Sequence, residues 1–364
     1  MSFKSLGLSE ALLKAISKKG YTTPSPIQQK AIPPVLEGKD VLASAQTGTG
    51  KTAGFTLPLL HILSENPKEK FKPIRALILT PTRELAAQVY ANVREYSEFL
   101  NLRSAVIFGG VNQKPQVATI RQGVDVLVAT PGRLLDLQNQ GLLSLKRVEI
   151  FVLDEADRML DMGFIDDLKK IISYLPKEHQ TLMFSATMAK SLDQLALKIL
   201  NKPEKISLSI AKPAAGVDQK VYLTFDDQKD KVIGHLLKER KAYKSIIIFT
   251  SSKMKVSQIV RSLNKAGFPS KGISSNLDQE AREDVLRGFR SRRIRILVAT
   301  DVMSRGIDIK EINMVINYDV PHDAADYVHR VGRTARAETK GEAVTLVNQK
   351  DMYKFRKIEE LIES

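Results

Sequence analysis

Short apolar, β-branched runs alternate with longer helix-compatible segments along the chain, and this alternation constrains the fold more than any other feature. In the first half these runs cover residues 41–45, 76–80, 105–108, 124–130, 150–154 and 181–185. In the second half they cover residues 221–225, 245–250, 294–300, 314–318 and 343–347. Runs that are apolar throughout are typical of strands buried on both faces of a parallel sheet. The pattern therefore predicts a doubly wound α/β architecture.

The two halves of the chain have similar layouts. Leu-Val-Ala-Thr at 127–130 leads into a Pro-Gly-Arg turn, and Leu-Val-Ala-Thr recurs at 297–300. Between the halves, Pro213 and Gly216 interrupt regular structure. A length of 364 residues with 43% hydrophobic content is enough for two separate cores. We therefore predict two domains, residues 1–208 and 218–364, joined by a linker at 209–217.

Charge and missing residue types narrow the possible functions. Lys and Arg total 56 against 41 acidic residues, a formal charge of +15 that favours a polyanionic partner such as nucleic acid. Ribosomal and membrane-surface proteins are often equally basic. The absence of cysteine excludes disulfides, thiolate metal sites and cysteine nucleophiles. The N-terminus lacks the apolar run of a signal peptide, and no apolar stretch reaches about 18 residues, so we expect a cytoplasmic protein without a membrane partner. We also expect the core to be monomeric.

A glycine-rich loop follows the run at 41–45 and precedes an apolar helix expected from Ala53 onward. It reads Gln46-Thr47-Gly48-Thr49-Gly50-Lys51-Thr52, and Ala45 stands where the general pattern has its first glycine. In this setting glycines let backbone N–H groups approach phosphate, and the helix N-terminus favours an anion. The loop therefore predicts a nucleoside triphosphate site. Lys51 would hold the β- and γ-phosphates, and the Thr52 hydroxyl would ligate Mg²⁺.

Carboxylates end the run at 150–154, which continues into Asp154-Glu155-Ala156-Asp157. A strand that ends in acids can place one of them opposite the phosphate loop to bind Mg²⁺, and Asp154 is the candidate. Glu155 would orient and deprotonate the attacking water. Alone, such a tetrapeptide would be interpreted as a solvated strand end. The glycine-rich loop upstream favours the catalytic interpretation for Lys51 and Glu155.

Polar residues and glycines follow three other strands of the first half. These segments are Pro81-Thr82-Arg83, Gly109-Gly110 and Thr130-Pro131-Gly132-Arg133. Ligands of open α/β sheets bind at the carboxyl ends of strands. Hydroxyls, glycine amides and arginines suit phosphate and sugar contacts, which position a nucleic acid strand without reading its sequence. Ordinary turn chemistry would explain each segment taken singly.

Together these motifs resemble the DEAD-box family of ATP-dependent RNA helicases. The segment 154–157 spells D-E-A-D, and 45–52 spells A-Q-T-G-T-G-K-T. The resemblance covers nearly the whole chain and follows the family's order of motifs. It implies two tandem RecA-like domains, each a mostly parallel sheet flanked by helices. It also implies ATP and Mg²⁺ as cofactors and RNA as the partner.

The resemblance assigns further roles in the first half. The segment 20–28 resembles the family's Q motif, in which Gln28 reads the edge of adenine, Tyr21 packs on the ring and Phe3 is the upstream aromatic residue. Ser185-Ala186-Thr187 would link the ATP state to RNA binding, with Asp157 as its hydrogen-bond partner. The strand-end segments would face RNA through Pro81, Thr82, Arg83, Gly110, Thr130, Gly132 and Arg133.

The second half lacks a phosphate loop and should act on the nucleotide held by the first. Its segment 329–336 places Arg333 and Arg336 about one turn apart, on one face of a predicted short helix. These two match the family's arginine fingers, which neutralise charge that builds on the γ-phosphate; the alternative is a basic solvated helix. The family commonly has glycine where Ala335 stands, and the Thr-Ala-Arg variant suggests the RhlE-like bacterial branch.

Other second-half residues also receive roles from the resemblance. Arg305 and His329 would couple the lobes, and Asp308 would reach the ribose hydroxyls. The RNA contacts would be Thr250, Gln279, Arg282, Thr300 and Asp301. Ser274-Ser275 departs from the His-Gly found in many relatives, just upstream of Gln279. A cluster at Arg287, Arg290, Arg292, Arg293 and Arg295 either extends the RNA track or forms a solvated helix end.

The sequence thus predicts an RNA-stimulated ATPase that separates short RNA duplexes locally through ATP-driven closure of two lobes, without sequence specificity. A nucleotide-gated RNA clamp or annealing factor would use the same closed state without productive unwinding. A DNA-directed helicase of the wider superfamily is a second alternative. A small-molecule P-loop kinase is a third, although it gives the second lobe no role.

Overall fold

The computed structural model describes residues 2–45, 48–67, 73–188, 190–208, 216–274, 277–300, 312–321, 324–334 and 341–363, with the backbone alone at 190, 191, 279, 325, 329 and 363. The chain divides into two compact units, Met1–Ile210 and Ala211–Ser364. Most of the predicted linker, 209–215, lies outside the described residues. Its last residue, Val217, begins a strand instead.

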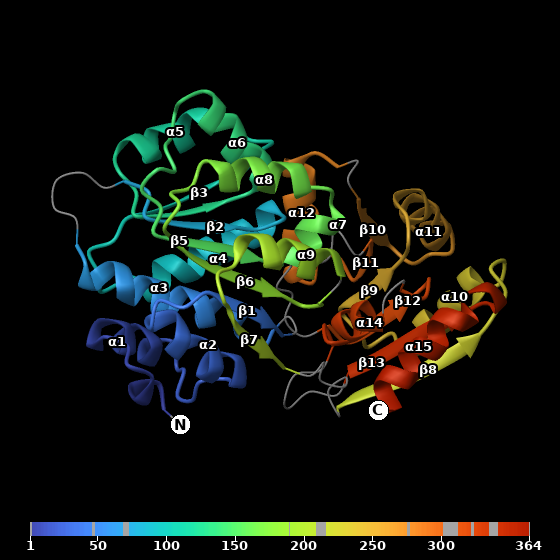
Figure 1. Ribbon diagram of the computed structural model, residues 1–364. Coiled ribbons are helices and arrows are strands. Elements are labelled where there is room, and N and C mark those ends of the chain that lie inside the picture. The colour runs from blue at the N-terminus through green and yellow to red at the C-terminus, as the bar shows by residue number, and fades with distance from the viewer. Residues whose placement is uncertain are drawn as a thin grey trace. The chain divides into compact units, whose positions relative to one another are not determined.

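The first unit contains a sheet of seven strands in the order β3-β4-β2-β5-β6-β1-β7. Every neighbouring pair is parallel. The strands are β1 (Val41–Ser44), β2 (Ala76–Leu79), β3 (Ser104–Ile107), β4 (Val126–Ala129), β5 (Ile150–Asp154), β6 (Gln180–Ser185) and β7 (Glu204–Ser207). Because all strands run the same way, their carboxyl ends lie at one edge of the sheet (Figure 1).

Helices cover both faces of this first sheet. One face packs on η1 (Phe3–Leu6), α1 (Glu10–Lys18), α2 (Pro26–Leu36), α3 (Lys51–Glu65) and α4 (Arg83–Tyr96). The other packs on α5 (Gln113–Arg121), α6 (Pro131–Asn139), α7 (Ala156–Asp161), α8 (Ile165–Ser173) and α9 (Lys190–Ile199). Side chains alternate along each strand, so Val41 and Ala43 face the first layer while Leu42 faces the second.

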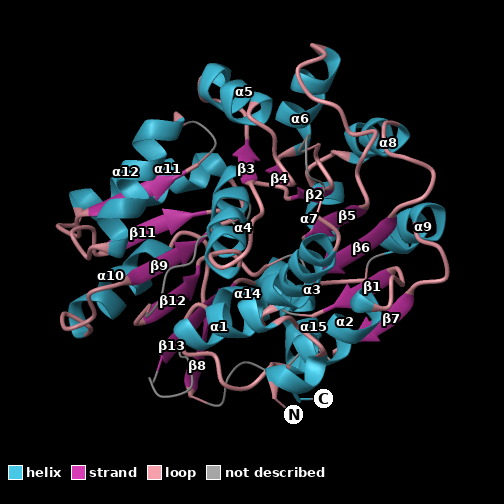
Figure 2. Ribbon diagram, turned by 90° about the vertical axis from the view of Figure 1, so that its left-hand side faces the viewer, coloured by secondary structure: helices cyan, strands magenta, loops and turns pink. Residues whose placement is uncertain are grey.

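The second unit has a parallel sheet of six strands in the order β10-β11-β9-β12-β13-β8. These are β8 (Val217–Leu223), β9 (Ile246–Phe249), β10 (Ser270–Ile273), β11 (Ile296–Ala299), β12 (Met314–Asn317) and β13 (Gly341–Val347). On one face lie α10 (Lys229–Glu239) and α11 (Lys253–Lys265). On the other lie α12 (Gln279–Arg290), α14 (Ala324–Val331) and, after η2 (Gln349–Asp351), α15 (Met352–Glu363). Figure 2 shows this layering in each unit.

The predicted architecture of two parallel sheets flanked by helices is confirmed, but two strands were missed. Both β7 and β10 lie at an edge of their sheet. In β7 only Ile206 is buried, and β10 reads Ser-Lys-Gly-Ile. An edge strand has one neighbour and less buried surface, so its sequence lacks the continuous apolar run that identifies a central strand.

Buried charged groups form hydrogen bonds and an ion pair at the amino-terminal end of the first sheet, opposite the edge that carries the candidate site. The Asp40 carboxylate accepts hydrogen bonds from the backbone N–H groups of Thr181 and Asn201, both at 2.7 Å. The fully buried Arg75 guanidinium binds the Glu149 carboxylate at 3.0 Å. No helix among the described residues is long and apolar enough to cross a membrane.

Candidate functional site

The glycine-rich loop follows β1 and leads directly into α3. The helix begins at Lys51, two residues before the predicted start, and Gly50 takes the N-cap position with a φ of 90°. The Lys51 ammonium is buried and donates to the carbonyl oxygens of Ala45 at 2.6 Å and Ser185 at 3.2 Å. It therefore bridges the ends of two neighbouring strands, β1 and β6. A buried cation beside a helix N-terminus suits a phosphate group.

Gln28 is held against this loop through both ends of its amide. Its Oε1 accepts from the Ser25 backbone N–H at 2.9 Å, and its Nε2 donates to the Gly50 carbonyl at 3.1 Å. The first contact belongs to a capping box at the start of α2. A Cβ at Gly50 would collide with Nε2 of Gln28. A residue larger than glycine at position 50 would therefore force the Gln28 amide to move away from the loop.

The two aromatic candidates of the Q motif lie in different surroundings. Phe3 is buried in the first core, in η1. Tyr21 keeps 44% of its surface exposed and makes a side-chain hydrogen bond with Tyr96, at the end of α4. Burial, together with this neighbour, raises the pKa of the Tyr96 hydroxyl. Adenine packing by Tyr21 stays a prediction, and the exposed ring leaves room for it.

Gly50→Ala should weaken nucleotide binding more than Gly48→Ala. Both glycines have a φ near 85–90°, so each alanine incurs left-handed strain of about 1–2 kcal/mol. Only the alanine at 50 meets the Gln28 amide; a Cβ at 48 meets nothing within 4 Å. Titration of both variants with ATP and GTP would measure this. Gly50→Ala should also lose preference for ATP, and an equal effect of the two alanines would contradict the role of Gln28.

Two carboxylates at the end of β5 are both buried. Asp154 accepts the Glu155 backbone N–H at 3.0 Å. Burial raises the pKa of the Asp154 carboxyl to about 7, Lys51 opposes this rise, and the neighbouring Glu155 charge adds to it. Glu155 has a φ of 53° at the N-cap of α7, and its carboxylate pairs with Arg158 at 3.1 Å. Carboxylate oxygens are the ligands that a hard cation prefers, and a cation beside Asp154 would favour its charged form.

Without ligand, Asp154 should make stability fall as the pH rises. Because its folded pKa of about 7 exceeds the ordinary 3.8, the folded chain keeps a proton that the unfolded chain releases between these values. Stability should therefore drop by up to ~1.4 kcal/mol per pH unit across this window and then level off. Asp154→Asn has no ionisable group at this position, so it should not lose stability in this way. Its melting temperature relative to wild type should increase from pH 5 to pH 8, and a constant difference would contradict the raised pKa.

The third acid of the tetrapeptide, Asp157, connects α7 to the end of β6. Its Oδ2 accepts from the Thr187 hydroxyl at 2.8 Å and from the Thr187 backbone N–H at 3.0 Å. The Ser185 hydroxyl donates to the Thr187 carbonyl at 2.8 Å. The segment 185–187 is thereby tied to the acidic motif on one side and, through Ser185, to Lys51 on the other. The predicted pairing of Asp157 with this segment is present in the structure.

The other strand-end residues of the first unit lie at the same edge of the sheet. Thr82 caps α4 by accepting the Leu85 backbone N–H at 3.3 Å. The Arg83 guanidinium lies directly against Gly110, where a Cβ would collide with it. Arg133 donates to the Val111 carbonyl at 3.0 Å. Thr130 is the N-cap residue of α6, followed by Pro131 and the exposed Gly132, and Pro81 is buried before α4.

Comparison with known proteins places this arrangement in a family. The DEAD/DEAH box helicase model matches residues 25–195, and the helicase conserved C-terminal domain model matches residues 228–338. RhpA of Helicobacter pylori, named a DEAD-box ATP-dependent RNA helicase, is 40% identical over 365 residues, which cover 100% of this chain and 73% of the relative. The chain belongs to the DEAD-box family of ATP-dependent RNA helicases. CshA of Listeria monocytogenes is also 40% identical, over 98% of this chain and 68% of its own.

Solved structures of other proteins also resemble this chain along its length. S. cerevisiae Dbp5 bound to RNA and ADP BeF3 superposes with a TM-score of 0.87 at 33% identity, covering 99% of this chain and 93% of that chain. Mss116p bound to ssRNA and AMP-PNP gives 0.85 at 30% identity, covering 100% and 78%. The family and the predicted fold are thereby confirmed. Membership of the narrower RhlE-like branch stays a prediction.

In the second unit of this DEAD-box protein, the predicted helix around the two arginines is wrong in extent. Helix α14 ends at Val331, and Arg333 lies in the turn that follows. Thr334 then forms a parallel bridge with Ile312, and its hydroxyl donates to the Ile312 carbonyl at 2.6 Å. Because residue 334 pairs as a short extended segment, Arg333 cannot continue the helix. Arg336 lies outside the described residues.

The other second-unit candidates are only partly described. Thr250 is fully buried after β9, and its hydroxyl donates to the Asp319 carboxylate at 2.8 Å. A direct phosphate contact from this hydroxyl would require that hydrogen bond to break. Thr300 and Arg282 are half-buried. Candidates outside the described residues are Gln46, Thr47, Asp301, Arg305 and Asp308, together with Ser275 and the side chains of Gln279 and His329.

The arginine cluster of residues 287–295 is divided by its contacts. Arg295 donates to the carbonyls of Tyr243 and Arg240, both at 2.7 Å, near the end of α10. Arg293 pairs with Asp284 at 3.1 Å. Arg287 and Arg290 are exposed on α12. The cluster is therefore not one continuous basic surface, because at least one of its members stabilises the fold.

Sequence reasoning missed two charged residues that contact the candidate site. Arg158 directly follows the acidic tetrapeptide, and its guanidinium pairs with the Glu155 carboxylate. Residues three positions apart are neighbours on a helix, so the sequence spacing could have indicated this ion pair. Asp319 comes two residues after β12 and binds Thr250 and Ser251. In the sequence, only the position of Asp319 just after a strand marked it as a candidate site residue.

Proposed function

We propose that this chain is an RNA-stimulated ATPase and helicase that separates short RNA duplexes locally through ATP-driven closure of its two lobes. The observation that carries the proposal is the buried Lys51 ammonium at the start of α3, near the buried Asp154 and Glu155 at the end of β5. Family membership supports the same reaction. We further propose the two predicted domains, with the second beginning at Val217, the first residue of β8, instead of at 218, and a cytoplasmic location.

The first lobe supplies the groups for hydrolysis. Lys51 binds the β- and γ-phosphates, and residues 48–52 direct backbone N–H groups to them. Gln28 recognises the edge of adenine. Glu155 holds and deprotonates the attacking water. Thr52 and Asp154 would hold a Mg²⁺ ion, which would neutralise negative charge on the phosphates when bound. Asp154 fits this role because it is a buried carboxylate, a hard oxygen donor, at the end of β5 and near Lys51.

The second lobe completes the reaction. Arg333 and Arg336 neutralise charge that develops on the γ-phosphate, and Asp308 contacts the ribose hydroxyls of ATP. Arg305 and His329, together with the pairing of Asp157 and Thr187, couple the ATP state to RNA binding. Because ATP and RNA both favour the closed state, each tightens the binding of the other.

RNA is bound by residues at the carboxyl ends of the strands in both lobes. In the first lobe Arg83, Arg133 and the glycines at 110 and 132 contact phosphates and sugars. In the second lobe the contacts come from Gln279, Arg282, Thr300, Asp301 and the segment after β9. Contacts to phosphate and to the 2′-hydroxyl give little sequence preference and favour RNA over DNA.

Comparing RNA and DNA as activators tests the proposed substrate. Single-stranded RNA should raise the rate of ATP hydrolysis, and DNA of the same sequence should raise it much less. The control is a chimeric strand in which a few deoxynucleotides interrupt RNA, which should stimulate to an intermediate extent. Equal stimulation by DNA would instead identify a DNA-directed helicase of the wider superfamily.

A further inference from the structure

Asp319, two residues after β12, accepts hydrogen bonds from the end of the neighbouring strand β9. Its Oδ2 accepts from the Thr250 hydroxyl and from the Ser251 backbone N–H, both at 2.8 Å. The residue is only 5% exposed. One carboxylate oxygen therefore holds both a side chain and the backbone of the segment that leaves β9.

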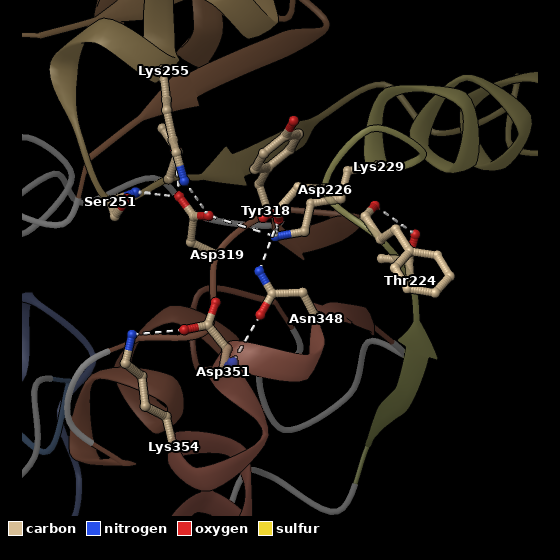
Figure 3. Close-up of polar contacts among 12 residues, drawn as sticks. Thr224, Asp226, Lys229, Ser251, Lys255, Tyr318, Asp319, Asn348, Asp351 and Lys354 are labelled. Atoms are coloured by element: carbon tan, nitrogen blue, oxygen red, sulfur yellow. Dashed lines mark hydrogen bonds and ion pairs between the residues drawn. The ribbon is translucent and has the colours of Figure 1, made fainter.

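Two lysines approach the other oxygen of the same carboxylate. The Lys255 ammonium, from the first turn of α11, lies 2.7 Å from Oδ1, and the fully buried Lys229 ammonium lies 3.6 Å away. Figure 3 shows Lys255, Lys229 and Ser251 directed at Asp319. Burial alone would raise the pKa of Asp319, but the hydrogen bonds from Lys255, Ser251 and Thr250 outweigh it and hold the pKa well below its ordinary value. The carboxylate is charged and fully engaged at neutral pH.

The backbone of Asp319 is bound by the helix that precedes Arg333. Arg330 of α14 donates to the Asp319 carbonyl at 2.9 Å and to the Asn317 Oδ1 at 3.0 Å. The same guanidinium lies over the Phe249 ring, with 5.1 Å to its centroid. Arg330 is itself buried. Asp319 thus touches the end of β9 with its side chain and the end of α14 with its main chain.

We propose that Asp319 is a positioning residue that fixes the segment after β9, on the RNA side, relative to α14, which leads to Arg333. The inference rests on the proposed function, which places RNA at the end of β9 and an arginine finger after α14. Asp319 touches neither ligand. It acts through Thr250, Ser251 and Arg330, so its loss should change the coupling between RNA binding and hydrolysis more than it changes ATP affinity.

Asp319→Asn tests the proposal, because it keeps the size of the side chain and removes its charge. We expect the RNA concentration for half-maximal ATPase stimulation to rise roughly tenfold, equivalent to about 1.4 kcal/mol. The KM for ATP and the basal rate without RNA should change less than twofold. The matched control is Asp226→Asn, which removes a carboxylate from the same cluster, where Asp226 binds Lys229 at 3.0 Å and Asn348 at 2.8 Å. The control should leave RNA stimulation unchanged.

A second variant, Lys255→Met, tests the same idea without altering Asp319 itself. It should raise the half-maximal RNA concentration less than Asp319→Asn does, because the hydrogen bonds from Thr250 and Ser251 remain. If Asp319→Asn matches Asp226→Asn in RNA stimulation while both lower the melting temperature, Asp319 is only structural and the inference fails. Absence of RNA stimulation in the wild-type protein would instead overturn the proposed function.

Discussion

Glu155→Gln should lower RNA-stimulated ATP hydrolysis by about 10²–10⁴-fold, the usual contribution of a general base, while ATP and RNA binding persist. The glutamine keeps the size of the side chain and can still accept a hydrogen bond, but it cannot take a proton from water. Glu155 is buried beside Asp154, and its carboxylate pairs with Arg158. Turnover, nucleotide affinity and RNA affinity should each be measured on the same preparation.

A matched acid-to-amide control separates this effect from a general loss of charge. Asp166→Asn removes an exposed carboxylate on α8, paired only with the exposed Lys169 at 2.8 Å among its described contacts. Hydrolysis by this variant should equal that of the wild-type protein. If Glu155→Gln retains wild-type turnover, Glu155 is not the base. If the variant loses ATP affinity in parallel with turnover, the Glu155 side chain contributes to binding of ATP in the ground state instead.

Arg333→Ala should reduce the maximal rate of hydrolysis by about 10³-fold, within the range of arginine fingers in other phosphoryl-transfer enzymes, with much less effect on ATP affinity. A group that acts only on charge developing in the transition state changes kcat rather than ground-state binding. Arg333 follows α14 in a turn, so its side chain is not held in a helical row. Hydrolysis rates at saturating RNA, together with equilibrium ATP titrations, would measure the two effects.

Arg261→Ala is the control for this prediction, because Arg261 is exposed on α11 in the same unit. It should leave both hydrolysis and ATP affinity unchanged. Equal losses of rate and affinity in Arg333→Ala would mean that this arginine binds ATP before the reaction. Arg333→Lys should recover little activity, since an ammonium cannot form the paired contacts of a guanidinium.

The parts of the fold that the sequence predicts well are those in which local pattern and packing agree. Central strands such as β1, β5 and β9 are buried on both faces, so their apolar runs are unbroken. The edge strands β7 and β10 were missed because only part of their surface is buried. The same reasoning explains β8, which begins at Val217 although only its later, more apolar part was predicted.

The candidate site also contains residues that the sequence identifies and contacts that it does not predict. Lys51 and Asp154 could be identified because a glycine-rich loop and an acidic strand end are consecutive in the sequence. The contacts of Asp319 with Thr250 and Ser251 join residues 68–69 positions apart, and no local pattern records such a pair. The extended pairing of Thr334 with Ile312 likewise overrides the helical spacing of Arg333 and Arg336. Tertiary pairing, which local spacing does not encode, decided both outcomes.

Release of one strand from a short RNA duplex tests the central claim most directly. The wild-type protein should release the strand with ATP and not without it, and Glu155→Gln should be unable to sustain repeated rounds of release. RNA-stimulated hydrolysis measured in parallel shows whether the protein is active. If hydrolysis is normal but ATP causes no strand release, the protein is a nucleotide-gated RNA clamp or annealing factor, and the account of it as a helicase is wrong.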